Sequence, residues 1–470
     1  MKQNNTSSLY ANSLWLLVFA LSCFILPSHA NSKSFESLSE QSNSDQSKWV
    51  VVLDDPRPER LKGWSGGSSY RGATNYDETL ALKRLASSVL DNISVELVTQ
   101  WPIKSINVHC LVILIPNAKQ VDIINKLEAD SRVKWVQSYQ TFEGRTIEEN
   151  LFEESHFEES HLKGKLFEKK ELLKEQKVKH LIDGEHYQVD PYLRLQTIFE
   201  QLNIKEVSRF LTGQGVTIAM IDSGVEKTHP ELSHAIVEQL DFVSTNELLA
   251  PSEHHGTGIA GVMIAKKGNG KGIIGLAPSA KLLAYRSCWE TQNNRTICDS
   301  LTLARALDRV AQVKPDLLNL SLTGPKDRLL DSLIDVIIKN GTHVVAAFDK
   351  TRSEMDRFPT FRAGVSIAQD FFSKNKYSDK TILTPGKEIL TTQPGKTYAF
   401  MSGSSIASAH LTSLYALAVQ ASPEIDLTKF SQLFKVYTQK TSSGNKTDVC
   451  AIFLKLQVDI ECSQKIIAHY

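Results

Sequence analysis

Short apolar runs alternate with helix-like stretches along residues 187–470. Four runs have the length and composition of buried strands, and they lie at 216–221, 281–285, 316–321 and 342–347. Amphipathic stretches lie between members of this set, at 300–313 and 328–340. Buried apolar strands separated by helices are typical of an α/β fold with a doubly wound, mostly parallel sheet flanked by helices. We expect such a sheet here, with functional residues beyond the carboxyl ends of its strands.

A smaller unit with a different order of elements precedes this region. The pattern predicts a strand, a helix, two strands, an amphipathic helix and a last strand, at 49–53, 77–90, 93–98, 106–115, 121–127 and 133–139. The order β-α-β-β-α-β is that of a small ferredoxin-like α+β domain, which we place at 49–142. No cluster of catalytic side chains is evident in it.

The segment between these two units, residues 143–186, is rich in Glu, Lys and His and contains a near-repeat, 152–156 against 157–161. A charged run of mixed sign is usually a solvated helix or linker. Its histidines could bind metal, but a flexible tract is a poor preformed site. We interpret the segment as an exposed connector that is open to proteolysis.

The first thirty residues have the features of an export signal. Lys2 begins a weakly basic start, 14–26 is an apolar run, and 28–30 is a small-x-small cleavage pattern. A transmembrane anchor would need about 20 apolar residues, and the apolar stretch continues past Cys23, which disfavours a lipoprotein anchor. We predict a signal peptide at 1–30 and a secreted product, extracellular or periplasmic, with no membrane association after its removal.

Composition and charge narrow the choice of function. The 470 residues suggest two to three domains, and 41% hydrophobic with 23% charged residues is typical of soluble globular chains. Lys+Arg and Asp+Glu are both 53, so the chain has no overall basic field to bind nucleic acid or an anionic membrane. The function must therefore come from a local site.

Five of the six cysteines lie beyond the predicted signal. Cys288 and Cys298 enclose one short segment, and Cys450 and Cys462 enclose another, so in an oxidising compartment we expect two local disulfides. Each would contribute about 2–3 kcal/mol by the chain-entropy model. Cys110 lies in an apolar run and is interpreted as a buried thiol. Zinc is the alternative, but no C-x-x-C or H-x-x-H pairing accompanies these cysteines.

Three short segments carry side chains that could act together. Asp222 follows the strand at 216–221, His255 begins a run of small residues, and Ser405 lies in a Gly-Ser turn before a long apolar helix. Each alone is more simply a cap or a turn. Together they favour a catalytic role, because serine becomes a good nucleophile when a histidine takes its proton and a buried carboxylate orients that histidine.

These segments resemble the motifs of the subtilisin-like serine proteases, peptidase family S8, over most of the last 280 or so residues. Residues 213–225 are similar to the aspartate motif, 255–257 to the histidine motif and 403–407 to the nucleophile motif. The order Asp, His, Ser is also that of subtilisin. The resemblance implies a catalytic triad, protein or peptide substrates and no required cofactor. Family members often bind structural calcium, but no ligand loop is identifiable in this sequence.

The resemblance also supplies a substrate groove and a role for the first domain. Residues 319–324 are similar to the edge segment that binds an extended peptide by strand addition, which implies contacts at Ser321, Leu322 and Thr323. The α+β unit is similar to the family's inhibitory prodomain, of the inhibitor I9 type. On this interpretation the protein is a zymogen, its prodomain is an intramolecular inhibitor, and the mature enzyme is a monomer.

One position departs from the family pattern. The family usually has an asparagine that donates a hydrogen bond to the oxyanion, but here Asp349 follows 346–348. An ionised carboxylate only accepts hydrogen bonds and would repel the oxyanion. Losing one such donor costs roughly 2.7–4 kcal/mol, or about 10²–10³ in turnover. A protonated Asp349 could still donate, so we expect slow or acid-favoured hydrolysis.

Two other functions compete with a secreted serine endopeptidase. A catalytically weak or inactive subtilisin-like protein that binds peptides is suggested by Asp349, but the intact triad argues against it. A lipase or esterase would carry G-x-S-x-G with serine before histidine, and 403–407 lacks the closing glycine. We therefore expect an endopeptidase that cuts peptide bonds through Asp222, His255 and Ser405.

Overall fold

The computed structural model describes residues 45–55, 80–144, 189–244, 250–371, 381–441 and 444–458. The predicted export signal and residues 145–186 of the predicted connector lie outside these ranges. Within them, no helix is long and apolar enough to cross a membrane.

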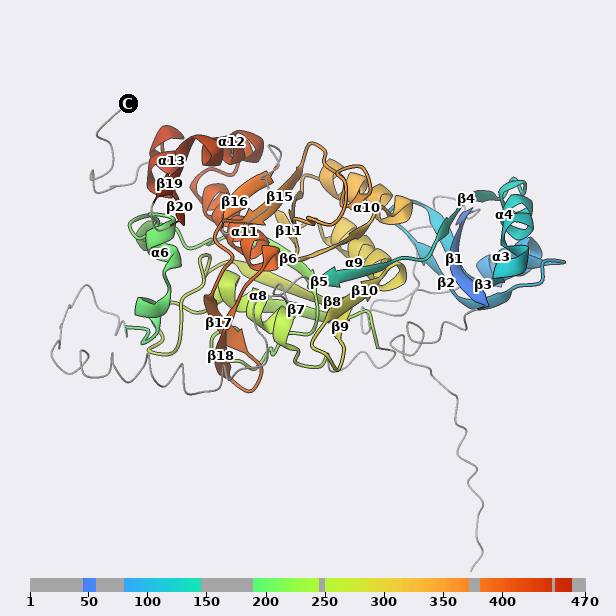
Figure 1. The fold of residues 1–470 in the computed structure, drawn as a ribbon, viewed down its shortest axis with the longest axis horizontal. Coiled ribbons are helices and arrows are strands. Elements are labelled where there is room, and N and C mark those ends of the chain that lie inside the picture. Colours follow the sequence, from blue (N-terminus) through green and yellow to red (C-terminus); the bar gives the residue numbers. More distant parts are fainter. Residues whose placement is uncertain are drawn as a thin grey trace, which may run out of the picture. The chain divides into compact units, whose positions relative to one another are not determined.

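The N-terminal unit is a four-stranded antiparallel sheet with two helices (Figure 1). Its strands are β1 Gln46–Asp54, β2 Glu96–Ile103, β3 Val108–Pro116 and β4 Val133–Ser138. Its helices are α3 Leu80–Leu90 and α4 Gln120–Glu128, with a 3-10 turn η1 Asn117–Lys119 before α4. The strand order β2-β3-β1-β4 and the β-α-β-β-α-β sequence agree with the ferredoxin-like prediction.

Strand β1 is apolar throughout its centre because both of its faces are covered. Val51 and Leu53 belong to the core that includes Ala86 of α3. Val50 and Val52 point to the opposite face and belong to a second core that also contains apolar residues of the C-terminal unit. Alternate side chains of a strand point to opposite faces, so a run without polar residues indicates a sheet buried on two sides.

The C-terminal unit is built on a seven-stranded sheet in the order β16-β15-β13-β11-β6-β8-β7. Its strands are β6 Thr217–Asp222, β7 Ile236–Asp241, β8 Lys281–Arg286, β11 Leu317–Leu320, β13 His343–Ala347, β15 Val365–Asp370 and β16 Thr381–Thr384. All neighbouring pairs are parallel. The doubly wound α/β prediction is therefore confirmed.

Helices cover both faces of this sheet (Figure 1). The longer ones are α8 His254–Ile264, α9 Ser300–Val313, α10 Arg328–Lys339, α11 Ser404–Ala421, α12 Leu427–Tyr437 and α13 Val449–Lys455. Short helical turns are η2 Leu193–Leu195, α6 Ile198–Gln201 and α7 Val207–Phe210. Ile218 and Met220 of β6 share a core with α8 and α11, whereas Ala219 and Ile221 share one with α9 and α10.

A second, smaller sheet joins the two units, in the order β14-β12-β5-β10-β9. Its strands are β5 Thr141–Gly144, β9 Cys288–Glu290, β10 Thr296–Asp299, β12 Leu322–Pro325 and β14 Arg357–Phe358. Strand β5 therefore crosses the predicted boundary between residues 142 and 143. Two separate hairpins complete the fold, β17 Ile389–Gln393 with β18 Thr397–Met401, and β19 Thr438–Thr441 with β20 Gly444–Thr447.

The cysteines follow the predictions as far as the structure describes them. Cys288 and Cys298 lie opposite each other on β9 and β10 and form a disulfide. Cys110 is a buried free thiol. Cys462 lies outside the described residues, so its pairing with Cys450 stays a prediction.

Candidate active site

Asp222 and His255 form a buried pair at the carboxyl end of the central strand β6. Asp222 is the last residue of β6 and His255 is the second residue of α8, and each is 2% exposed. His255 Nδ1 lies 2.6 Å from Asp222 Oδ1. Nε2 of His255 has no hydrogen-bond partner among the described residues. When Nδ1–H donates to the carboxylate, the neutral ring keeps Nε2 free to accept a proton.

A close approach of α8 to the end of β6 makes this pair possible. A Cβ atom on Gly256 would lie 2.3 Å from the carbonyl oxygen of Ser223. The N–H of Gly256 donates to Ser223 Oγ at 2.9 Å. A glycine is required at this position because the first turn of α8 lies directly on the backbone that follows Asp222.

Further carboxylates surround His255. Glu290 of β9 accepts a hydrogen bond from the backbone N–H of His255, at 2.6 Å. Burial lowers the pKa of His255, but the charge and hydrogen bond of Asp222 and the charges of Glu290 and Glu253 together outweigh it, so the pKa lies above its ordinary value. Glu290 and Glu253 were not among the predicted site residues, because no motif in the chain marks them.

Ser405 is the second residue of α11 and is fully buried. Its Oγ donates to the carbonyl oxygen of Ser321 at 2.9 Å, and Ser321 Oγ donates to the carbonyl oxygen of Ser405 at 3.0 Å. The candidate nucleophile and the first predicted substrate contact are therefore neighbours. The first N–H groups of a helix have no acceptor within the helix, so they can stabilise a negative charge that forms there.

Asp349 lies close to the same helix end. Ser404 Oγ donates to the carbonyl oxygen of Phe348 at 3.0 Å, which joins α11 to the segment after β13. Asp349 is 1% exposed, and its Oδ1 accepts from the N–H and Oγ1 of Thr351 at 2.8 and 2.6 Å. Its Oδ2 lies 3.4 Å from Nε of Arg352. Both carboxylate oxygens thus have donors from the residues that follow in the chain, which hold the side chain in place.

The predicted substrate edge is occupied by a strand of the same chain. Strand β5 lies antiparallel to β12, with Gly144 opposite Leu322 and Glu143 opposite Thr323. On its other side β5 lies antiparallel to β10, with Gly144 opposite Thr296. This is the geometry of an extended peptide bound by strand addition.

The two ends of β5 make different contacts. A Cβ atom on Gly144 would lie 3.2 Å from Cε1 of His255, so the strand reaches the buried histidine. Phe142 is fully buried, and its ring lies 5.5 Å from that of Phe358 in an edge-to-face contact. A Cβ atom on Gly324 would come within 2.2 Å of the Phe142 ring, so the absence of a side chain there makes room for the aromatic group.

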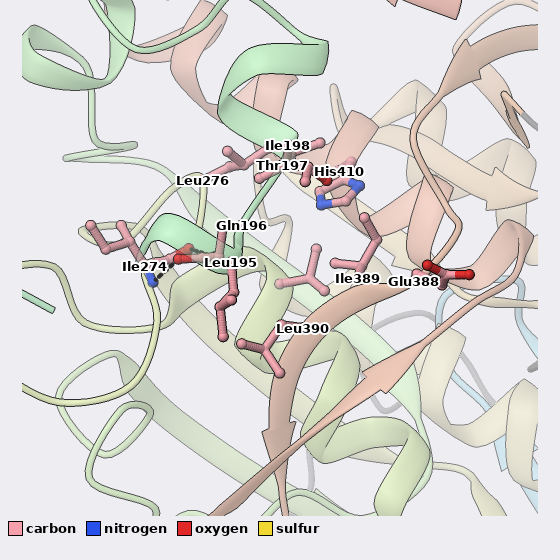
Figure 2. Close-up of a pocket in the computed structure, with 11 residues that line it drawn as sticks. Leu195, Gln196, Thr197, Ile198, Ile274, Leu276, Glu388, Ile389, Leu390 and His410 are labelled. Carbon is pink, nitrogen blue, oxygen red and sulfur yellow. Dashed lines mark hydrogen bonds between the residues drawn. The ribbon is translucent and has the colours of Figure 1, made fainter. Parts of the chain in front are cut away.

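A small pocket lies elsewhere on the C-terminal unit (Figure 2). It is lined by Leu195, Gln196, Thr197, Ile198, Val262, Ile274, Leu276, Glu388, Ile389, Leu390 and His410. Burial lowers the pKa of His410 to about 4, so its ring is neutral at ordinary pH, and Nδ1 lies 2.7 Å from the carbonyl oxygen of Pro385. The pocket contains none of the three triad candidates. Across the described ranges, no group of three or more His, Cys, Asp or Glu residues could hold a metal ion.

Comparisons with known proteins find similar serine proteases. A model of the subtilase family of peptidases matches residues 213–366. The chain is 32% identical over 211 residues to a thermophilic serine proteinase of Bacillus sp. (strain AK1), covering 43% of this chain and 52% of that protein. It is 30% identical over 213 residues to thermitase of Thermoactinomyces vulgaris, covering 44% of this chain and 75% of thermitase. The chain thus spans about half the length of the first relative.

A solved structure supports the fold. Fervidolysin from Fervidobacterium pennivorans, described as a keratinolytic enzyme related to subtilisin, superposes with a TM-score of 0.60 at 16% identity, covering 88% of this chain and 62% of fervidolysin.

Proposed function

This chain belongs to the subtilase family of serine endopeptidases, and within that family we propose that it is a secreted endopeptidase made as a zymogen. The observation that carries the proposal is strand β5, which pairs with β10 and β12 and ends against His255. An extended peptide held in that position presents a backbone carbonyl next to the proposed catalytic groups.

The proposed reaction uses the three residues in distinct roles. Ser405 Oγ attacks the peptide carbonyl after it turns from the carbonyl oxygen of Ser321 toward His255. His255 Nε2 takes the serine proton and then gives it to the leaving amine, while Asp222 holds the ring with Nδ1 as the donor. Water then releases the acyl group by the same steps in reverse, and the reaction needs no cofactor.

The negative charge of the intermediate forms at the amino end of α11. We assign one oxyanion donor to the backbone N–H of Ser405. Asp349, which stands where the family usually has asparagine, repels the oxyanion when it is ionised, so hydrolysis is slow or favoured by acid. The same residue favours the alternative function, a catalytically weak or inactive subtilisin-like protein that binds peptides.

The prodomain acts as an intramolecular inhibitor on this proposal. Strand β5 pairs with Leu322 and Thr323 of the proposed peptide-binding edge, and the Phe142 side chain anchors it. Ser321 is the third proposed contact of this edge. Because a Cβ atom on Gly144 would contact the His255 ring, we place the first cut at one of the two peptide bonds that follow Gly144, not deeper in the connector. The mature enzyme would be a monomer that acts on protein or peptide substrates outside the cytoplasm.

A serine-directed fluorophosphonate tests the enzymatic part of this proposal. We expect covalent labelling of the processed protein and no labelling of the Ser405→Ala variant. Equally low labelling of both proteins would contradict the endopeptidase proposal and favour the peptide-binding alternative.

The processing site has its own test. N-terminal sequencing of the shortened chain should find a new first residue at position 145 or 146, and Ser405→Ala should remain uncut. A new N-terminus far into the connector would contradict the assignment of β5 as the segment that is cut.

A further inference from the structure

The carboxylate of Glu290 occupies the amino end of the helix that carries His255. Glu253, the N-cap residue of α8, makes no side-chain hydrogen bond to the helix. Glu290 comes instead from β9 and accepts from the backbone N–H of His255 at 2.6 Å. A negative charge at this end of a helix is favourable, because it faces unpaired N–H groups and the positive end of the helix dipole.

The position of Glu290 is itself fixed by buried charged groups. Its backbone N–H donates to Glu253 Oε1 at 3.1 Å. Arg286, which is 3% exposed, donates to the two carboxylate oxygens of Glu253 at 3.0 and 2.9 Å. Arg286 also lies 3.3 Å from Asp241 of β7. A buried guanidinium held by two carboxylates leaves little freedom to the backbone next to it.

The hairpin that carries Glu290 also forms one wall of the peptide-binding edge. Glu290 lies opposite Thr296, and Thr296 lies opposite Gly144 of the strand held in the cleft. The disulfide between Cys288 and Cys298 joins the same two strands, β9 and β10. One covalently linked hairpin therefore contacts both the backbone of His255 and the peptide in the cleft.

We propose that Glu290 is a positioning residue for His255. Glu290 fixes the first turn of α8 relative to the strand that binds the peptide. Its role in catalysis rests on the proposed function, because His255 must be the base. The contact between the two residues does not depend on that assignment.

The charge of Glu290 gives this role a measurable consequence. Three carboxylates influence the His255 ring, namely Asp222 from β6, Glu253 from the segment before α8 and Glu290 from β9. Arg286 of β8 is bound to Glu253 and Asp241. Removing the charge of Glu290 therefore lowers the pKa of His255, and the pH at which activity is lost on acidification moves down.

Two substitutions separate the charge from the contact. Glu290→Gln removes the charge but keeps an oxygen that can accept from the N–H of His255, whereas Glu290→Ala removes both. Glu238→Gln is the matched control, because Glu238 of β7 accepts hydrogen bonds from Arg309 and Tyr285 on another part of the unit. The readouts are kcat and KM against pH for each processed protein, and the titration of His255 followed by hydrogen–deuterium exchange at its ring carbon in the Ser405→Ala background.

We expect both Glu290 variants to lower the midpoint of the His255 titration by about 0.5 pH unit or more. We also expect Glu290→Ala to lower kcat about tenfold, with a smaller loss in Glu290→Gln, because misplacing a catalytic group is costly. The control should keep the wild-type midpoint. A midpoint unchanged in both Glu290 variants, with or without a loss of stability, would overturn the proposal. If the wild type fails to hydrolyse peptides but the midpoint shifts as expected, the positioning role stands and the proposed function fails.

Discussion

The two halves of the proposed active site are stabilised by different kinds of contact. Around Asp222 and His255, buried side chains bind one another and three carboxylates influence one imidazole ring. Around Ser405, the contacts run from side chains to backbone carbonyl oxygens, and Asp349 carries the buried carboxylate that we propose opposes the oxyanion. The first half favours a protonated histidine, while the second opposes the oxyanion on the mechanism that we propose. We infer that the second half limits the rate.

Asp222→Asn tests the first half most severely. The amide can donate to Nδ1 of His255, which would place the ring proton on Nε2 and leave no base for Ser405. We expect kcat/KM to fall about 10⁴-fold, as similar substitutions in other triads do. Asp331→Asn serves as the control, because Asp331 pairs with Arg362 away from the site. A loss below tenfold in a folded Asp222→Asn protein would remove Asp222 from the mechanism.

Asp349→Asn tests the second half, and here the expected change is a gain. The amide restores a donor for the oxyanion and removes a negative charge, so kcat at neutral pH should rise about 10²–10³-fold. If the wild type is acid-favoured, the ratio of the two rates should shrink as the pH falls. Arg352→Gln is the companion variant, because it alters the partner of Asp349 without adding a donor. Unchanged or lower activity in Asp349→Asn would mean that this half does not limit the rate.

Phe142→Ala tests whether both halves act on the same bound strand. The Phe142 ring is buried against Phe358. Losing a buried aromatic anchor typically costs about 2 kcal/mol, or roughly 30-fold in binding. We expect the first cut in the full chain to slow by about that factor. The rate is measured from the appearance of the shortened chain on gels. Thr141→Ala, at the exposed start of β5, should process at the wild-type rate. Equal rates for the two variants would mean that β5 is not the segment that is cut.

The triad candidates could be predicted from the sequence because their chemistry lies in local motifs. Asp222 follows an apolar strand, His255 precedes a run of small residues, and Ser405 opens a helix. The apolar strands β6, β8, β11 and β13 were predictable for the same reason, since burial on both faces leaves a continuous apolar run.

The rest depends on contacts between segments far apart in the chain. Strand β5 has alternating polar residues and only four members, and its partners lie more than 150 residues later. Glu290 follows a cysteine and a tryptophan in a stretch without a recognisable motif, and only the tertiary contact between β9 and α8 brings it to the backbone of His255. Strand β7 was missed because polar residues interrupt its apolar pattern.

Removing the Cys288–Cys298 disulfide tests whether the two halves of the proposed site act independently, and its effect on activity should be the smallest of the four. A loop closed by a separation of 10 residues contributes about 2–3 kcal/mol to the free energy of unfolding. The double variant Cys288→Ser/Cys298→Ser should lose that stability, measured by urea unfolding, with Cys110→Ala as the single-thiol control. Because β9 carries Glu290 and β10 pairs with β5 in the proposed peptide-binding edge, KM should rise a few-fold and the acid limb of kcat/KM should move toward lower pH. The response to Asp349→Asn should be the same with or without the disulfide, since the Asp349 carboxylate is bound by Thr351 and Arg352, which belong to neither strand. A loss of that response would show that the two halves are coupled through the hairpin and would end the distinction between them.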